Sequence, residues 1–259
     1  MASVSAAGRL ASIAKPNPAA CLRLFCFPFA GGSAHFFRSW ADELPPDLQP
    51  KIEICGLRFP GHEMNRSEPL FTRLAPIVET LRPVVAGPPA VPFAFFGHSM
   101  GALVSFELAR DLRRRKMPTP MHLIVSGHRA PQLPDPHPKL HRLPDPEFLA
   151  TLRKYGGTPE AVIENAELVQ LFMPVLRADF AVVESYAYKP EAPLDCSITA
   201  LGGVEDARVT RDELSAWQAQ TAQSFSVRMF PGDHFYLRSL HSQFLQVLGQ
   251  DLKQVVRRV

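Results

Sequence analysis

The sequence predicts an α/β fold, a mostly parallel sheet flanked by helices, with a helical insertion. Short apolar runs with the character of strands alternate with helical patterns along the 259-residue chain. A serine between two glycines lies where one such run gives way to a helical pattern. Residues 129–194 then break the alternation with helical patterns alone. With 46% hydrophobic residues, a chain of this length can bury one large core.

Six runs have the length and apolar character of buried strands. They are Leu22–Phe27, Ile52–Leu57, Val91–Phe96, His122–Ser126, Ser197–Leu201 and Ser226–Phe230. Helical patterns between them are typical of a parallel sheet covered on both faces. We therefore expect residues 21–128 and 195–259 to form the core and residues 1–20 to be a flexible N-terminal tail.

The insertion at residues 129–194 opens with a proline-rich loop, in which continuous helix or a central strand is excluded. A helix is then predicted from Asp145, with Pro146 suited to its first position and Gly156 to its end. A longer helical pattern follows from Glu167 to about Tyr186. The insertion is interpreted as a lid, and an ordinary packed insertion without a gating role remains the alternative.

The stretch "AFFGHSMGALVSF" predicts a nucleophile. Ser99 follows an apolar strand and precedes a helical pattern, and Gly97 and Gly101 flank it at a distance of two residues. In a nucleophile elbow the serine adopts a strained backbone conformation that exposes its hydroxyl, and the flanking positions must be small. A turn with an ordinary serine is the alternative.

A serine hydroxyl needs a base and an acid that orients the base, and in this arrangement they follow the serine in the order acid, histidine. His234 lies in "MFPGDHFYL", directly after the last predicted strand, and is favoured over His241 in the final helical pattern. Both Glu205 and Asp206 lie in the loop after the preceding strand, and Asp206 is favoured. Asp233 is expected to serve its own loop.

An oxyanion hole is expected from two backbone N–H groups. Met100, directly after the nucleophile, supplies one of them. Phe29 or Ala30, in the loop after the first core strand, supplies the other, and Gly31 and Gly32 let that loop turn close to the ligand.

Charge and composition exclude other classes. The net charge of +3 is mild and its basic residues are dispersed, so nucleic acid is not an expected partner. The four cysteines show no metal or disulfide spacing and are interpreted as reduced, buried thiols. No secretory leader pattern and no run of eighteen apolar residues is recognised, which favours a cytoplasmic protein without membrane attachment.

The chain resembles the type II thioesterases, which accompany polyketide synthases and nonribosomal peptide synthetases. The resemblance covers about residues 22–250 and rests on several motifs in register: "LFCFPFAGGSAHFF", "GLRFPGHEMNRSEP", "FFGHSMGALVSFELA", "EFLATLRKYGGTPEAVIENAELVQLFMPVLRADF", "CSITALGGVEDARV" and "FPGDHFYL". It implies an α/β-hydrolase core with a helical lid, and hydrolysis of acyl groups from the phosphopantetheine arm of carrier proteins. It places the nucleophile at Ser99, the acid at Asp206 and the base at His234, with no metal or redox cofactor.

One segment departs from the family pattern. After the Pro-Gly pair of "PGHEMNRSEP" the family usually has an arginine and a more basic sequence, whereas this chain has His62, Met64 and Asn65. The departure leaves the three catalytic positions unchanged. How this loop contacts the carrier or its arm is therefore not inherited from the resemblance.

Apolar faces of the two predicted lid helices are expected to cover the acyl chamber, with Phe148, Leu152, Leu171 and Phe172 as the expected contacts. Two rival functions remain open at this point. An esterase or lipase would cleave oxygen esters with the same three residues, and a non-catalytic carrier-binding module would use the scaffold alone. Comparison of rates on matched thioester and oxygen-ester substrates distinguishes the two enzymes.

Overall fold

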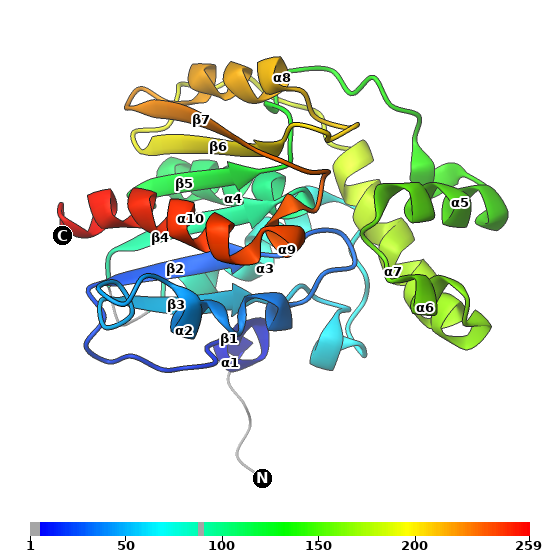
Figure 1. Cartoon of the computed structure of the whole chain (residues 1–259), viewed down its shortest axis with the longest axis horizontal. Helices are drawn as coiled ribbons and strands as arrows, with labels where there is room; N and C mark the ends of the chain where they lie inside the picture. Colours follow the sequence, from blue (N-terminus) through cyan, green and yellow to red (C-terminus); the bar gives the residue numbers. More distant parts are fainter. Residues whose placement is uncertain (1–5, 88–90) are drawn as a thin grey trace, which may run out of the picture.

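A seven-stranded sheet forms the centre of the computed structural model, which describes residues 6–87 and 91–259 (Figure 1). The strand order is β1-β3-β2-β4-β5-β6-β7, and every pairing is parallel except that of β1 with β3. The strands are β1 (Ala11–Ser12), β2 (Leu22–Phe27), β3 (Ile52–Leu57), β4 (Phe93–His98), β5 (His122–Ser126), β6 (Ser197–Gly203) and β7 (Phe225–Phe230). The predicted α/β fold with a mostly parallel sheet is confirmed.

The strand β4 begins two residues later than predicted and continues to His98. Pro92 has no N–H to donate to a neighbouring strand, although its carbonyl still accepts the N–H of Arg23 at 2.9 Å. The register pairs Phe27 of β2 with Gly97 of β4, so both strands end at the same edge of the sheet. Ser99 therefore lies at the carboxyl edge, where the loops of an α/β sheet build sites.

Helices cover both faces of the sheet and bury separate apolar clusters. One cluster includes Leu81 and Phe106 and lies beneath α3 and α4, and the other includes Trp40 and Phe244 and lies beneath α2 and α10. The helices of the core are α1 (Ala6–Leu10), α2 (Trp40–Glu43), α3 (Leu74–Val85), α4 (Met100–Arg114), α8 (Arg211–Ser215), α9 (Tyr236–Ser239) and α10 (His241–Val256), with short 3-10 turns η1 (Ala34–Phe37), η2 (Glu63–Asn65) and η4 (Ala216–Gln220). Continuous apolar strands buried on both faces are typical of such an architecture.

The N-terminal segment differs from the predicted flexible tail. Residues 6–12 form α1 and β1, and β1 pairs antiparallel with β3. Leu10 is buried in the core, and its carbonyl accepts the N–H of Arg58 at 2.8 Å. The segment covers the edge of β3, which would otherwise leave backbone groups unpaired. Residues 1–5 of the predicted tail lie outside the described residues.

The segment between β5 and β6 is helical, as expected, and projects beyond the carboxyl edge of the sheet (Figure 1). It comprises η3 (Leu140–Arg142), α5 (Asp145–Tyr155), α6 (Glu160–Ile163) and α7 (Ala166–Glu184). The helix α5 ends at Gly156, which has a φ of +67°, and the side chain of Asn165 caps α7. These helices pack around a small apolar cluster of their own, which includes Phe148 and Met173.

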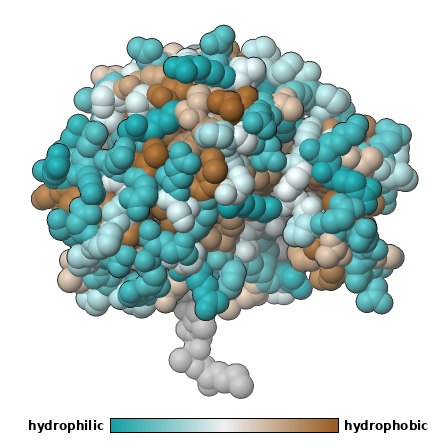
Figure 2. All heavy atoms as spheres, viewed as in Figure 1, coloured by the Kyte–Doolittle hydropathy of each residue, from teal (hydrophilic) through white to brown (hydrophobic). Residues whose placement is uncertain are grey.

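Hydrophilic residues cover most of the face seen in Figure 2, with apolar residues scattered among them. In the part of the chain that the structure describes, no helix has the length and hydropathy needed to cross a bilayer. The four cysteines are free thiols, and burial raises the pKa of Cys55 and of Cys196 to about 12.

Candidate active site

Ser99 occupies a sharp turn between β4 and α4. Its φ of 53° and ψ of −117° lie outside the regions that residues with a side chain ordinarily adopt, a conformation worth roughly 1–3 kcal/mol of strain. Its N–H donates to the carbonyl of Ser126 at 2.7 Å, and its carbonyl accepts the N–H of Ala102 at 3.0 Å. The surrounding backbone therefore fixes the turn and exposes the hydroxyl.

The two glycines that flank Ser99 occupy positions where a side chain has no room. A Cβ at Gly97 would lie 2.2 Å from the Gly101 carbonyl oxygen, and a Cβ at Gly101 would lie 2.1 Å from the Phe27 carbonyl oxygen. Because these contacts are with backbone atoms, a side chain could be accommodated only by moving β2 or α4. The predicted requirement for small residues thus has a specific steric cause.

His234 and Asp206 are joined by a hydrogen bond in which Nδ1 of the ring donates to Oδ2 of the carboxylate at 2.7 Å. They lie in the loops after β7 and β6, which are neighbouring strands. The Asp206 carboxylate also accepts the N–H of Arg208 at 2.8 Å, and its side chain is buried. The acid therefore has a fixed orientation toward the ring.

The other candidates for base and acid lie elsewhere. Glu205 is exposed, and His241 at the start of α10 pairs with Glu43 at 2.5 Å. Asp233 accepts the N–H of Phe235 at 2.8 Å, so it stabilises its own loop. None of these three side chains lines the pocket that contains Ser99.

A buried histidine supports His234 from beneath. The ring of His98 lies 5.0 Å from that of His234, centre to centre, and its Nδ1 lies 2.8 Å from the hydroxyl of Ser126, which in turn lies 2.6 Å from that of Tyr236. Burial and the nearby His234 lower the pKa of His98 well below its usual value. His98 is therefore neutral and packs against the ring of His234.

The expected oxyanion donors also lie at this site. Phe29 and Ala30 line the same pocket as Ser99, and no hydrogen bond occupies their N–H groups within residues 6–87 and 91–259. Met100 is the first residue of α4, where backbone N–H groups have no partner inside the helix. The N–H groups of Gly31 and Gly32, by contrast, bond to Asp179 and to the Phe29 carbonyl.

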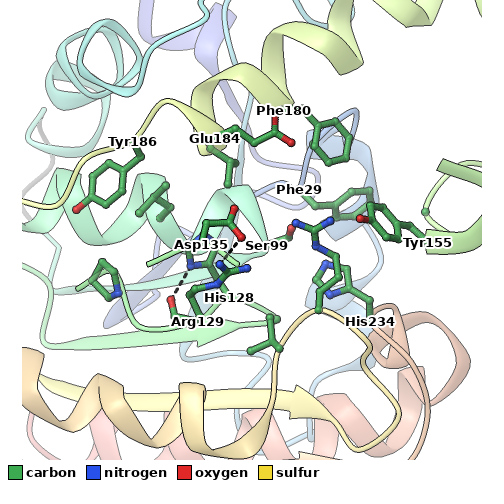
Figure 3. A pocket seen from close by; sticks show the side chains of 18 of the residues that line it. Phe29, Ser99, His128, Arg129, Asp135, Tyr155, Phe180, Glu184, Tyr186 and His234 are labelled. Carbon is green, nitrogen blue, oxygen red and sulfur yellow. Dashed lines mark hydrogen bonds and ion pairs between the residues drawn. The ribbon is translucent and has the colours of Figure 1, made fainter. Parts of the chain in front are cut away.

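Ser99 and His234 line one pocket of about 330 Å³ between the core and the insertion (Figure 3). Leu152, Tyr155, Leu176 and Phe180 of the insertion form part of its wall. Leu152, one of the expected acyl contacts, therefore shares a pocket with Ser99. Phe148, in contrast, is fully buried in the cluster of the insertion and lines neither this pocket nor the second one.

Charged residues in this pocket were missed by the sequence analysis. Arg129 pairs with Asp135, and Arg208 lies over the Tyr155 ring at 4.5 Å. Burial lowers the pKa of His128, which also lines the pocket, to about 4. Arg129 and Asp135 lie in the loop after β5, at the carboxyl edge of the sheet, and this position in the sequence could have indicated that they belong to the site.

A second pocket of about 670 Å³ adjoins the first. The two share Phe29, Ala30, Gly157, Thr158 and Leu176, so the loop after β2, the turn after α5 and the helix α7 lie between them. Leu171 and Phe172 line this second pocket and are absent from the wall of the pocket that contains Ser99. The described residues contain no cluster of three or more side chains able to hold a metal ion.

Comparison with known proteins identifies the family. The Thioesterase domain family matches residues 22–252. The chain is 45% identical over 243 residues to the gramicidin S biosynthesis protein GrsT of Aneurinibacillus migulanus, a match that covers 94% of this chain and 93% of the relative. It is 39% identical over 225 residues to the thioesterase PikA5 of Streptomyces venezuelae, covering 86% and 78% of the two chains.

Solved structures agree with this grouping. The type II thioesterase BorB from the borrelidin biosynthetic cluster superposes with a TM-score of 0.83 at 34% identity, covering 93% of this chain and 96% of BorB. RedJ, a thioesterase from the prodiginine pathway of Streptomyces coelicolor, has a TM-score of 0.83 at 36% identity, covering 92% and 89%. The chain therefore belongs to the thioesterase family, and within it to the type II thioesterases.

Proposed function

We propose that the protein hydrolyses acyl thioesters on the phosphopantetheine arm of acyl or peptidyl carrier proteins, with Ser99, His234 and Asp206 as a catalytic triad. The observation that carries this proposal is a strained serine that shares a pocket with a histidine whose Nδ1 donates to a buried carboxylate. That arrangement activates a hydroxyl for acyl transfer. The similarity to proteins of gramicidin, borrelidin and prodiginine biosynthesis supports the proposal that the substrate is attached to a carrier protein.

In the acylation half, Nε2 of His234 takes the proton of the Ser99 hydroxyl as its oxygen attacks the thioester carbonyl. The negative charge on the carbonyl oxygen is stabilised by the N–H of Met100 and by that of Phe29 or Ala30. The carbon–sulfur bond then breaks, and the His234 proton passes to the departing thiolate. Asp206 holds Nδ1 protonated and stabilises the imidazolium that forms.

In the deacylation half, His234 takes a proton from water as the water oxygen attacks the acyl-enzyme. A second tetrahedral intermediate collapses, the bond to the Ser99 oxygen breaks, and the serine recovers a proton from His234. The products are the free carboxylic acid and the unloaded carrier. No metal or redox cofactor takes part in this scheme.

The two adjoining pockets suggest how the substrate lies. We place the acyl group in the pocket with Ser99, and the arm in the second pocket across the loop after β2. Arg66 and Arg238 line that second pocket and suit a phosphate or an acidic carrier surface. Removal of aberrant or stalled acyl groups, rather than release of a finished product, is the role that we propose.

The Ser99→Ala variant tests the proposal. Mass spectrometry of an acylated carrier protein should show turnover reduced about a millionfold, if the triad behaves like that of subtilisin. Ser105→Ala is the matched control, because Ser105 is buried in α4 and its hydroxyl donates only to the Ala102 carbonyl at 2.9 Å. A folded Ser99→Ala protein that retains more than about a tenth of the activity would exclude Ser99 as the nucleophile.

A second measurement tests the class of bond. Acyl groups of equal length are presented as thioesters and as oxygen esters, and the ratio of the two kcat/KM values is determined. The proposal expects the thioester to be preferred. Faster cleavage of the oxygen ester would instead assign the protein to the esterases.

A further inference from the structure

Asp179 of α7 reaches from the insertion to the loop that carries the expected oxyanion donors. Its Oδ2 accepts the N–H of Gly31 at 2.8 Å and also lies 2.9 Å from Nε2 of His62. The side chain of Asp179 is 2% exposed. One carboxylate oxygen thus joins three segments: the insertion, the loop after β2 and the loop after β3.

The loop at Gly31 is packed tightly against α7. A Cβ at Gly31 would lie 2.5 Å from Cδ2 of Leu176, which is three residues before Asp179 on the same helix, and the φ of Gly31 is +68°. Gly31 directly follows Phe29 and Ala30, which line the Ser99 pocket and carry the expected oxyanion N–H groups. A shift of α7 at Leu176 and Asp179 therefore moves the peptides that would bind the oxyanion.

His62 completes the contact as a donor on both sides of its ring. Its Nδ1 lies 3.0 Å from the carbonyl of Pro60 and its Nε2 lies 2.9 Å from the Asp179 carboxylate. Both neighbours accept hydrogen bonds only, so both can be satisfied only by the doubly protonated imidazolium. Burial lowers the pKa of His62, while Asp179, the Pro60 carbonyl and Glu63 together raise it by more, so the pKa lies above its usual value.

We propose that Asp179 is a positioning residue for hydrolysis: from α7, and with His62 as its partner, it fixes the Gly31 peptide and thereby the oxyanion loop. The inference rests on the proposed function, because the loop matters only if its N–H groups stabilise charge on the substrate. It assigns α7 a role beyond covering the pocket. The loop after β2 is correctly positioned for hydrolysis only when α7 is packed against the core.

The expected effect is kinetic. Removal of one oxyanion donor lowers kcat by about 10²–10³-fold in a serine hydrolase, and a displaced loop should lose part of that effect. We expect Asp179→Ala to lower kcat about 10–100-fold with KM changed less than about threefold. Asp179→Asn keeps an oxygen that accepts the Gly31 N–H, so it should recover most of the lost kcat.

The matched control is Asp251→Ala. Asp251 is also a buried aspartate of a long helix, paired with Arg228 at 2.5 Å between α10 and β7, and it lines neither of the two larger pockets. Its loss should lower stability while kcat stays within about twofold of the wild type. An equal loss of kcat in both alanine variants would reduce Asp179 to a general packing role and overturn the proposal.

Inhibitor binding separates loop position from substrate binding. A trifluoromethyl ketone forms a tetrahedral oxyanion on the serine, whereas a substrate amide binds without developing that charge. Asp179→Ala should weaken binding of the ketone by about the same factor as it lowers kcat, and it should leave the affinity for the amide unchanged. Ketone affinity equal to that of the wild type would contradict the proposal, as would a kcat within threefold of it.

If Asp179→Ala does not fold, Asp179→Glu serves in its place. The glutamate keeps the charge but moves the carboxylate by one methylene, so kcat should fall below that of Asp179→Asn. A kcat for Asp179→Glu equal to that of the wild type overturns the proposal. Failure of the proposed function itself is recognised separately, because it requires activity in Ser99→Ala.

Discussion

The carboxylate of Asp206 and the imidazole of His234 meet at 2.7 Å, although each comes from a different loop at the carboxyl edge of the sheet. The neighbouring Glu205 points to solvent, while its N–H donates to the Gly232 carbonyl at 2.9 Å. That backbone bond ties the acid loop to the histidine loop. Of the two adjacent acidic residues, Asp206 therefore contacts the His234 ring and Glu205 does not.

Asp206→Asn is expected to lower turnover about ten-thousandfold, because the amide favours the wrong tautomer of His234. Glu205→Gln is the matched control and should change turnover less than about fivefold, roughly 1 kcal/mol. Turnover of both variants is measured on one acylated carrier protein. The reverse ranking would transfer the role of the acid to Glu205.

Gly101→Ala should disrupt the turn that holds Ser99. Its Cβ would lie 2.1 Å from the carbonyl oxygen of Phe27, in a central strand that cannot yield. Overpacking of this kind typically costs about 1–3 kcal/mol, and we expect at least the upper value together with loss of turnover. Stability from urea unfolding and turnover on a carrier substrate provide the test.

Gly156→Ala is the control for that experiment. The space around its Cβ is open, with the nearest atom at 3.7 Å, so only the φ of +67° opposes the substitution. We expect a loss of about 1–2 kcal/mol and retained turnover. Equal activity of the two variants would show that the elbow tolerates a side chain.

The contribution of His62 to stability should depend on pH. Its folded pKa is raised above the usual value of about 6.5, so the stabilisation is fully present below pH 6.5 and is lost as pH rises through the folded pKa. Asp179 and Glu63 are the acidic groups that face the ring, Glu63 itself being paired with Arg58 at 3.3 Å.

The measurement compares the free energy of unfolding of the wild type with that of His62→Gln between pH 5.5 and about 9. The advantage of the wild type should be largest at the acidic end and should shrink as the pH rises. An advantage that is constant, or that grows with pH, would show that the ring is neutral in the fold.

Much of this site could be predicted from the sequence because it depends on order along the chain. Ser99, Asp206 and His234 each follow a recognisable strand, and parallel strands bring their carboxyl ends to one edge. The Gly31–Asp179–His62 contact could not be predicted in this way. It depends on how α7 docks, and a buried aspartate within an apolar helix face gives no periodic signal of its partner.

The same limit explains why the sequence does not show which pocket each apolar residue of the insertion borders. Helical periodicity shows which side chains share an apolar face, but not which of two adjoining cavities that face borders. Leu152 and Phe172 both belong to such faces and border different pockets, while Phe148 fills the interior of the insertion. The segment at residues 6–12 was missed for a related reason, since a helix and a strand of this length carry too few residues for a periodic pattern.

Leu152→Ala should change the acyl preference of the enzyme, because Leu152 borders the pocket of Ser99. One methylene group more or less in a hydrophobic pocket is worth about 1–3 kcal/mol, or 10–200-fold, in discrimination between substrates. We therefore expect the ratio of kcat/KM for long over short acyl groups to rise about tenfold.

Two control variants separate this effect from its alternatives. Phe148 lies on the same helix and in the same apolar cluster as Leu152 but borders neither pocket. Phe148→Ala should therefore lower stability by about 3–5 kcal/mol and leave the ratio of kcat/KM values unchanged. Phe172→Ala alters the second pocket, where we place the arm, so it should raise KM equally for both chain lengths. A ratio altered by Phe172→Ala but unaffected by Leu152→Ala would exchange the roles assigned to the two pockets and place the acyl chain beside α7 and η2.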